Sequence, residues 1–292
     1  MAGIIWLASY PKSGNTWLRA FLHNLMRNAA RPIEPNRLNE LTLGDGMARF
    51  FAPHAKGRAT IDMPLEEIAA LRAQVQRDLA ATSPDTVFVK THNWLGLDHG
   101  HPCIDMNVTA GAIYVVRNPL DVAPSLADHF GVSLDQAIAQ MGDGNARTLN
   151  LKHRVPDVMG SWSNHVKSWA GQRNSRLHVM RYEDMAAKPL AAFTQLTRFL
   201  GLPASRERIE RAIAFSSFAT LQKLESGKGF VERSSHSKAF FRQGEAGGWR
   251  RILSSAQVQR LCAAHKEQMQ AFGYWPLPPA DRARFEITQL EK

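Results

Sequence analysis

An apolar run that leads through a compact polar turn into an amphipathic stretch restricts the fold of this chain more than any other feature. Residues Ile4–Ala8 are apolar and suit a buried strand, and the polar turn 9–16 follows them directly. From Trp17 onward, apolar residues recur at helical spacing. A buried strand followed by a tight turn and a helix is the repeating unit of α/β folds with parallel strands.

The rest of the chain alternates in the same way between short apolar runs and amphipathic stretches. Strands are predicted at Ile4–Ala8, Val87–Lys90, Ile113–Val116 and Leu177–Tyr182. Helices are predicted after Gly14, after Pro64, after Pro189 and over Ala256–Phe272. Segments 28–60, 131–160 and 226–248 show neither period and are predicted to be irregular. The sequence therefore predicts an α/β fold with a central, mostly parallel sheet flanked by helices.

The turn after the first strand has the composition of an anion-binding loop. A helix N-terminus offers unpaired N–H groups and a partial positive charge, and Gly14 lets the backbone wrap closely around an anion. Lys12 adds a full charge, and Ser13, Asn15 and Thr16 add short donors. The lysine precedes the glycine, whereas in a Walker A loop it follows the last glycine. The turn is therefore predicted to bind phosphate without being a Walker A loop.

Two later strands also end in residues that suit such a site. Val87–Lys90 is followed by Thr91 and His92, and a histidine at the carboxyl end of a strand lies where α/β enzymes place reacting groups. Ile113–Val116 is followed by Arg117, whose guanidinium can bind a phosphate through two donors.

A helix is expected to begin just after Arg117 and to supply the hydroxyl of Ser125 to the same phosphate. Pro124 is compatible with that helix if Asp121 caps it, because Pro124 then falls in the first turn.

Composition adds a preference for an anionic ligand. The 292 residues include 36 Lys and Arg against 26 Asp and Glu, a net charge of +10, and no run of basic residues long enough for a nucleic-acid tail.

Cys103 and Cys262 have no metal or redox spacing and are predicted to be reduced thiols of a cytoplasmic protein. The N-terminal apolar run is too short for a signal peptide, and no window resembles a membrane span.

Taken in order, these motifs resemble those of the cytosolic-type sulfotransferases, which use 3′-phosphoadenosine 5′-phosphosulfate (PAPS). Tyr10–Trp17 resembles the 5′-phosphosulfate loop Y-P-K-[SA]-G-[TN]-T-W of that family. Lys90–His92 resembles its K-T-H segment, and Arg117–Ser125 resembles its 3′-phosphate motif R-N-P-x-D-x-x-x-S. The matched motifs run from residue 4 to residue 250 in the order of the family.

Three weaker matches lie towards the C-terminus. Arg181–Asp184 resembles the Y-E-D segment, and Phe215–Phe218 resembles a [TS]-[SF]-F segment that faces the nucleotide. Phe241–Arg250 resembles the R-K-G-x-x-G-D-W-K element, with Gln243 in place of the usual lysine and Gly248 in place of the aspartate. One cationic contact to the 3′-phosphate is thus missing, and a lower donor affinity is expected.

The resemblance implies a P-loop-like three-layer fold and transfer of a sulfuryl group from PAPS to a hydroxyl, with release of adenosine 3′,5′-bisphosphate (PAP). It implies that His92 is the general base, that Lys12 stabilises the leaving phosphate under the restraint of Ser13, and that Lys90 lies near the sulfuryl group. The donor-binding residues that it implies are Lys12, Ser13, Gly14, Asn15, Thr16, Trp17, Arg117, Ser125, Tyr182, Ser216, Phe218, Arg242, Gln243 and Gly244.

The acceptor is expected to be a small molecule with a hydroxyl, bound within a single domain over residues 1–292. Loops 42–60, 93–110, 131–160 and 226–241 are expected to line its pocket. Neither nucleic acid nor a membrane is expected as a partner. A homodimer stays open, because the animal dimer motif K-x-x-x-T-V-x-x-x-E is not evident after Trp249.

Three other interpretations compete with this one. A nucleotide-dependent kinase is disfavoured by the reversed lysine–glycine order and by the lack of carboxylates that could bind Mg²⁺. Sulfuryl transfer does not require Mg²⁺, because a sulfuryl group carries less charge than a phosphoryl group. A non-catalytic nucleotide-binding protein would also fit the net charge. The run Asp98–Cys103 holds metal-ligand residue types, but a polar loop is the favoured interpretation, and no metal is expected.

Overall fold

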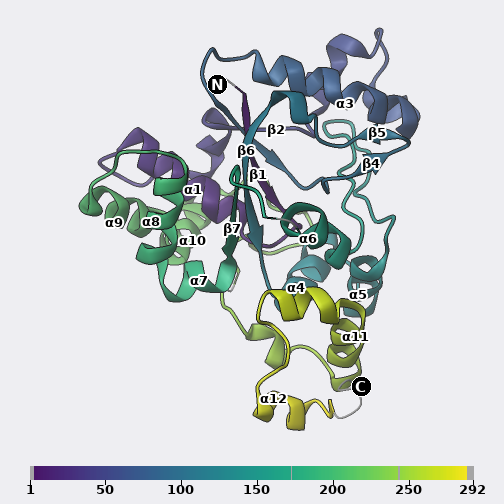
Figure 1. Ribbon diagram of the computed structural model, residues 1–292, viewed down its shortest axis with the longest axis vertical. Coiled ribbons are helices and arrows are strands. Elements are labelled where there is room, and N and C mark those ends of the chain that lie inside the picture. The colour runs from purple at the N-terminus through teal and green to yellow at the C-terminus, as the bar shows by residue number, and fades with distance from the viewer. Residues whose placement is uncertain (1–2, 172, 243, 288–292) are drawn as a thin grey trace.

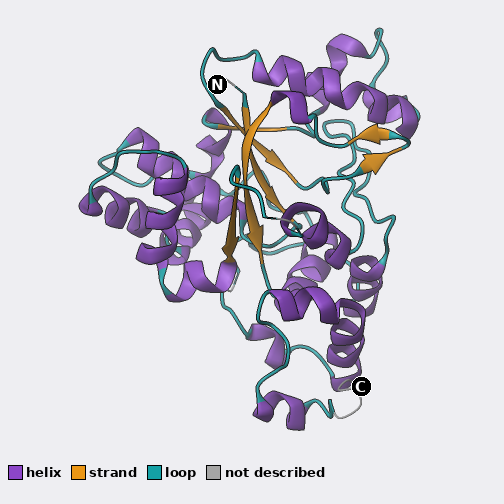
Figure 2. Ribbon diagram, viewed as in Figure 1, coloured by secondary structure: helices purple, strands orange, loops and turns teal. Residues whose placement is uncertain are grey.

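The computed structural model describes residues 3–171, 173–242 and 244–287, and its centre is a sheet of five parallel strands. Figure 1 shows the strands side by side with helices on either side, and Figure 2 marks the sheet in orange. The predicted α/β fold is confirmed. In spatial order the strands are β2 (Thr42–Gly44), β3 (Val87–Thr91), β1 (Ile4–Ser9), β6 (Thr109–Val116) and β7 (Leu177–Arg181).

Each strand of the middle of the sheet packs alternate residues against opposite helical layers, as a period of two requires. Ile4, Trp6 and Ala8 of β1 face one apolar cluster, whereas Leu7 faces another. The first cluster includes residues of α3 (Leu65–Ala80), α4 (Pro119–Phe130), α5 (Leu134–Gly142), α6 (Trp162–Ala170) and α11 (Ser255–Ala271). The second includes residues of α1 (Asn15–Arg27), α7 (Tyr182–Ala187), α8 (Pro189–Phe199) and α9 (Arg206–Phe215).

Several smaller elements complete the molecule. They are α2 (Ala48–Phe51), the hairpin of β4 (Leu97–Asp98) and β5 (His101–Pro102), α10 (Phe218–Lys228) and α12 (Pro279–Arg284). No helix within the described part of the chain is long and apolar enough to cross a bilayer.

Two of the segments predicted to be irregular contain regular structure. Helix α5 lies within 131–160 and begins with a capping box of Ser133 and Gln136, a signal that the sequence displays. Segment 28–60 contains β2 and α2, which are three and four residues long and therefore too short to show a period. The last predicted strand ends one residue early, because Tyr182 begins α7.

The expected cap of α4 is wrong. Asn118 caps this helix by accepting a hydrogen bond from Leu120 N, and Pro119 takes the first helical position, so Pro124 lies in the helix interior. Asp121 instead accepts hydrogen bonds from the backbone N–H groups of Gly247 and Trp249, at 2.7 and 3.1 Å. Its carboxylate therefore fastens a distant segment to the start of α4.

The order of the strands determines where a ligand site is expected. From β1 the chain builds β2 and β3 on one side and β6 and β7 on the other, so the order reverses at β1. In open parallel sheets, ligands bind beyond the carboxyl ends of the strands at such a reversal. The turn with Lys12, the end of β3 with His92 and the end of β6 with Arg117 meet at this point.

Candidate active site

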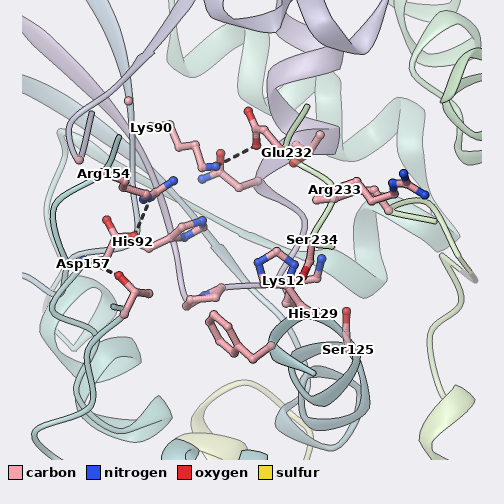
Figure 3. A pocket seen from close by; sticks show the side chains of 18 of the residues that line it. Lys12, Lys90, His92, Ser125, His129, Arg154, Asp157, Glu232, Arg233 and Ser234 are labelled. Atoms are coloured by element: carbon pink, nitrogen blue, oxygen red, sulfur yellow. Dashed lines mark hydrogen bonds and ion pairs between the residues drawn. The ribbon is translucent and has the colours of Figure 1, made fainter. Parts of the chain in front are cut away.

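A cavity of about 1240 Å³ opens at the carboxyl edge of the sheet. Its wall includes residues that follow each of the five strands, and Figure 3 shows Lys12, Lys90 and His92 directed into it from β1 and β3. It also includes most of the residues that the sequence singled out, namely Lys12, Gly14, Asn15, Thr16, Trp17, Lys90, His92, Arg117, Ser125, Tyr182, Phe218, Arg242 and Gly244.

The turn between β1 and α1 holds an uncommon backbone conformation. Lys12 has φ of 67° and Gly14 has φ of 109°, both in the left-handed region. That conformation is costly for a lysine, and a residue with a side chain rarely keeps it without functional reason. Gly14 is also close to a ring: a Cβ atom added there would lie 2.8 Å from Cδ2 of Tyr182. Only glycine allows this turn and this ring to approach so closely.

Arg117 joins the turn to two other segments. Its Nη1 donates to the carbonyl of Lys12 at 3.1 Å, and its Nη2 donates to the carbonyl of Glu245 at 3.0 Å. The guanidinium lies 4.2 Å from the centroid of the Tyr182 ring, and the Tyr182 hydroxyl donates to Gly244 O at 2.8 Å. The predicted phosphate-binding turn and the predicted arginine are thus in direct contact.

The imidazole of His92 is fixed in orientation by the neighbouring strand. Its Nδ1 lies 2.8 Å from the carbonyl of Ser9, which can only accept, so Nδ1 carries the proton and Nε2 keeps its lone pair. Burial, followed by the charge of Lys90, lowers the pKa of His92 to about 3. The imidazole is therefore neutral at physiological pH, which is the state that a general base needs.

The backbone around His92 is held from α6. His165 Nε2 donates to the carbonyl of His92 at 3.2 Å, while its Nδ1 accepts from the hydroxyl of Tyr114 at 2.9 Å. Trp169 Nε1 donates to the carbonyl of Asn93 at 3.0 Å. Burial lowers the pKa of His165 to about 3, so it stays in the neutral form that both hydrogen bonds require. Helix α6 thus positions the residue next to the cavity.

Two lysines enter the cavity beside His92. Lys12 Nζ lies 4.1 Å from the centroid of the Phe240 ring, and burial, followed by the charge of Lys90, lowers the pKa of Lys12 to about 8. Lys90 Nζ lies 3.0 Å from Oε2 of Glu232. Burial likewise lowers the pKa of Lys90. Both ammonium groups are therefore poorly solvated cations at the centre of the site.

Several charged groups of the cavity could not be found from the sequence. Glu232 bridges Lys90 and Arg19, whose Nη1 lies 2.7 Å from Oε1. Burial alone would raise the pKa of Glu232, but these two cations hold it well below its ordinary value. Arg154 binds Asp157 at 2.6 Å near His92, as Figure 3 shows. No local pattern signals these pairs, because their partners are far apart in sequence or lie in irregular segments.

A few of the named residues lie elsewhere. Ser216 is buried and its hydroxyl donates to Ala212 O, so it faces its own helix and is not part of the cavity wall. Ser13 is also buried behind the wall, with a hydroxyl that has no partner among the described residues. Gln243 falls outside the described residues.

The expected acceptor loops differ in their contribution. Segments 42–60, 131–160 and 226–241 supply wall residues, whereas 93–110 supplies none, because its hairpin packs against α3. In that hairpin Asp98 pairs with His99 and Arg147 at 2.9 and 3.3 Å. Among the described residues no three His, Cys, Asp or Glu side chains are arranged to hold a metal ion.

An α/β fold whose cavity gathers cations at the strand ends, with a neutral histidine beside them, defines a group-transfer enzyme for anionic donors. The sulfotransferase domain family matches residues 3–273, and the chain belongs to that family.

Relatives are distant but match over most of their length. The chain is 25% identical to cytosolic sulfotransferase 5 of Arabidopsis thaliana over 278 residues, which cover 91% of this chain and 80% of the relative. It is 27% identical to sulfotransferase 1B1 of Canis lupus familiaris over 275 residues, with 90% and 82% covered.

Solved structures share the fold. Retinol dehydratase in complex with androsterone and the inactive cofactor PAP superposes with a TM-score of 0.62 at 19% identity, covering 91% of this chain and 80% of that one. Mouse sulfotransferase SULT7A1 complexed with PAP superposes with a TM-score of 0.59 at 20% identity, covering 97% and 88%.

The contact between Gly14 and Tyr182 can be tested by comparing two glycines. Gly14→Ala adds left-handed strain and a clash with the ring, so we expect it to lower the free energy of unfolding by ~2–4 kcal/mol. Gly57 has φ of 78° with open space around it. Gly57→Ala therefore adds strain alone, and we expect a loss of ~1 kcal/mol. Urea denaturation of both variants measures the difference, and equal losses would contradict the close approach.

Proposed function

We propose that this protein transfers the sulfuryl group of PAPS to a hydroxyl of a small-molecule acceptor and releases PAP. One observation carries the proposal: Arg117 contacts the carbonyl of Lys12, so the two predicted ends of a donor site lie within one cavity that also holds His92. Membership of the sulfotransferase family supports the reaction class.

The donor half of the cavity suits a doubly phosphorylated adenosine. The start of α1 and Lys12 would hold the 5′-phosphosulfate, and Arg117, Ser125 and Arg242 would hold the 3′-phosphate. Trp17 Nε1 and Arg117 Nε are buried polar atoms of wall residues without partners among the described residues, which fits a polar ligand at this place. Tyr182 and Trp17, whose ring centroids are 5.5 Å apart, offer faces for the adenine.

In this reaction His92 would accept a proton and Lys12 would stabilise a developing negative charge. Nε2 of His92 accepts the proton of the acceptor hydroxyl as that oxygen bonds to sulfur and the bond between sulfur and the 5′-phosphate oxygen breaks. The negative charge that develops on the phosphate is met by Lys12 and by the N–H groups at the start of α1. The carboxylate of Asp157 raises the pKa of His92 and so opposes the effect of burial.

The acceptor and the setting of the enzyme are further parts of the proposal. Retinol dehydratase has been solved with androsterone and with retinol. We extend this preference for small molecules to the present chain and treat residues 1–292 as a single domain. Several relatives are named cytosolic, and we propose the same compartment. The oligomeric state stays open, with a homodimer as one option that the sequence leaves.

Loss of the base separates turnover from donor binding. In His92→Asn the amide nitrogen can still donate to Ser9 O, but no group remains to accept the acceptor proton. We expect turnover to fall by ~10²- to 10⁴-fold, with the affinity for PAP within about twofold. Product formation and calorimetry measure the two quantities. His101→Asn, on the β5 hairpin outside the cavity, is the matched control, and turnover of His92→Asn within a few-fold of wild type would refute the role.

The charge of Lys12 should appear in the pH dependence of donor binding. Because the pKa of Lys12 is lowered to about 8, the ammonium is charged below that pH and loses its proton as the pH rises through it. We expect the affinity for PAP to fall above pH 8 by up to about tenfold per pH unit, as measured by calorimetry between pH 7 and 9.5. Lys12→Arg stays charged and should remove this dependence; a flat wild-type profile would argue against the contact.

The role of Arg117 is tested with two nucleotides that differ in one group. We expect PAP to bind about 10- to 100-fold more tightly than AMP, which lacks only the 3′-phosphate, because a charge-assisted pair contributes ~1.5–3 kcal/mol. In Arg117→Gln the gap should shrink to a few-fold. Calorimetric titration of both nucleotides gives the ratio. Equal affinity of the wild type for PAP and AMP would overturn the assignment of the 3′-phosphate.

A further inference from the structure

The wall of the cavity carries more positive than negative charge. Nine Lys or Arg residues and five Asp or Glu residues line the whole cavity. Every one of the five carboxylates already has partners. Asp121 accepts from backbone N–H groups, and the others pair with cations as Asp128–Arg242, Asp157–Arg154, Glu232–Lys90 and Glu245–Arg251. The acids therefore neutralise only part of the wall.

Besides Lys12 and Arg117, which we assign to the donor, three cations of the wall have no ion pair with any described residue. Arg49 follows β2, Lys152 belongs to the turn 151–154, and Arg233 belongs to the covering segment, which we define as residues 229–241. Met47 and Arg154 form an antiparallel bridge, and Ala48 N donates to His153 O at 3.1 Å. These contacts bring the start of α2, which carries Arg49, next to the turn that carries Lys152. Figure 3 shows Arg233 near Glu232 and Ser234.

Apolar side chains accompany these cations. Leu149 is 76% exposed and Val231 is 72% exposed, although both line the cavity. Leu151, another wall residue, is 39% exposed. Large apolar side chains gathered at the mouth of a cavity mark a binding surface. Each of these two segments of the wall thus presents an apolar side chain next to a cation, Leu151 before Lys152 and Val231 near Arg233.

We propose that the acceptor is an anionic amphiphile: a small molecule with a hydroxyl, an apolar body and a carboxylate or phosphate group at a distance from the hydroxyl. The hydroxyl is presented to His92, the body lies against Leu149 and Val231, and the anionic group is attracted by Arg49, Lys152 and Arg233. This inference rests on the proposed function. The cavity has room for donor and acceptor together, since a single ligand site occupies ~300–1,000 Å³.

The three cations are exposed, so they act on binding more than on chemistry. Attraction between exposed charges is screened by salt over roughly 8–10 Å, and each exposed pair contributes ~0.2–1 kcal/mol. The preference for an anionic acceptor should therefore appear in its affinity and KM, should weaken with salt, and should leave kcat nearly unchanged.

The test compares 8-(4-hydroxyphenyl)octanoate with its methyl ester, which has the same hydroxyl and the same chain without the charge. Calorimetric titration into the protein saturated with PAP measures the affinity of each, and product formation with PAPS measures turnover. We expect the acid to bind about tenfold more tightly than the ester at low salt and this ratio to shrink in 0.5 M NaCl.

Variants locate the preference. We expect Arg49→Gln, Lys152→Gln and Arg233→Gln each to reduce the ratio of acid to ester affinity by about two- to fivefold, and the triple variant to abolish it. Lys223→Gln, an exposed lysine of α10 outside the cavity wall, is the control and should leave the ratio unchanged. The affinity for PAP should be the same in all five variants and in wild type.

The outcomes separate this inference from the function on which it rests. Equal affinity for acid and ester, or a ratio that the triple variant leaves intact, overturns the anionic acceptor even if both compounds are sulfated. Preferential binding of the acid without sulfuryl transfer to the hydroxyl of either compound supports the charged subsite and counts against the sulfotransferase reaction.

Discussion

The proposed donor half of the site depends on one guanidinium. Arg117 donates to the carbonyls of Lys12 and Glu245 and lies over the ring of Tyr182, so it joins the first turn, the end of β6, the start of α7 and the segment before Trp249. Asp121 reinforces this junction through the N–H groups of Gly247 and Trp249. Four segments that are distant in sequence thus behave as one unit, and the turn can keep a strained backbone because its neighbours fix it.

The acceptor side follows a different principle, since its key group is held by hydrogen bonds to backbone carbonyls. His92 donates to β1, and α6 grips the chain on either side of the His92–Asn93 peptide. The imidazole has one tautomer and one orientation before any ligand arrives, which would lower the reorganisation needed in the proposed proton transfer. Burial and the charge of Lys90 lower the pKa of His92, and the negative charge of Asp157 offsets part of this decrease.

Much of this arrangement could be predicted from sequence, because it follows from where strands end. Lys12, His92 and Arg117 each come directly after an apolar run, and parallel strands bring such positions to one edge. The strand β2 could not be predicted because three residues show no period, whereas the capping box of α5 is a signal that the sequence contains. The role of Asp121 and the ion pairs of Glu232 could not be found, since each depends on a partner more than a hundred residues away. Ser216 matches the motif in residue type, but its hydroxyl donates to Ala212 O at the end of α9. A motif match does not predict in which direction such a side chain points.

Glu232 also makes the covering segment responsive to what binds beneath it. This carboxylate anchors residues 229–241 to β3 through Lys90 and to α1 through Arg19, and Phe240 of the same segment rests on Lys12. Any anion that competes for Lys90 weakens that anchor, and by thermodynamic reciprocity a firmly seated segment weakens the anion by the same factor. Binding of an anion and release of the covering segment are therefore coupled, because the anion and Glu232 compete for the ammonium group of Lys90.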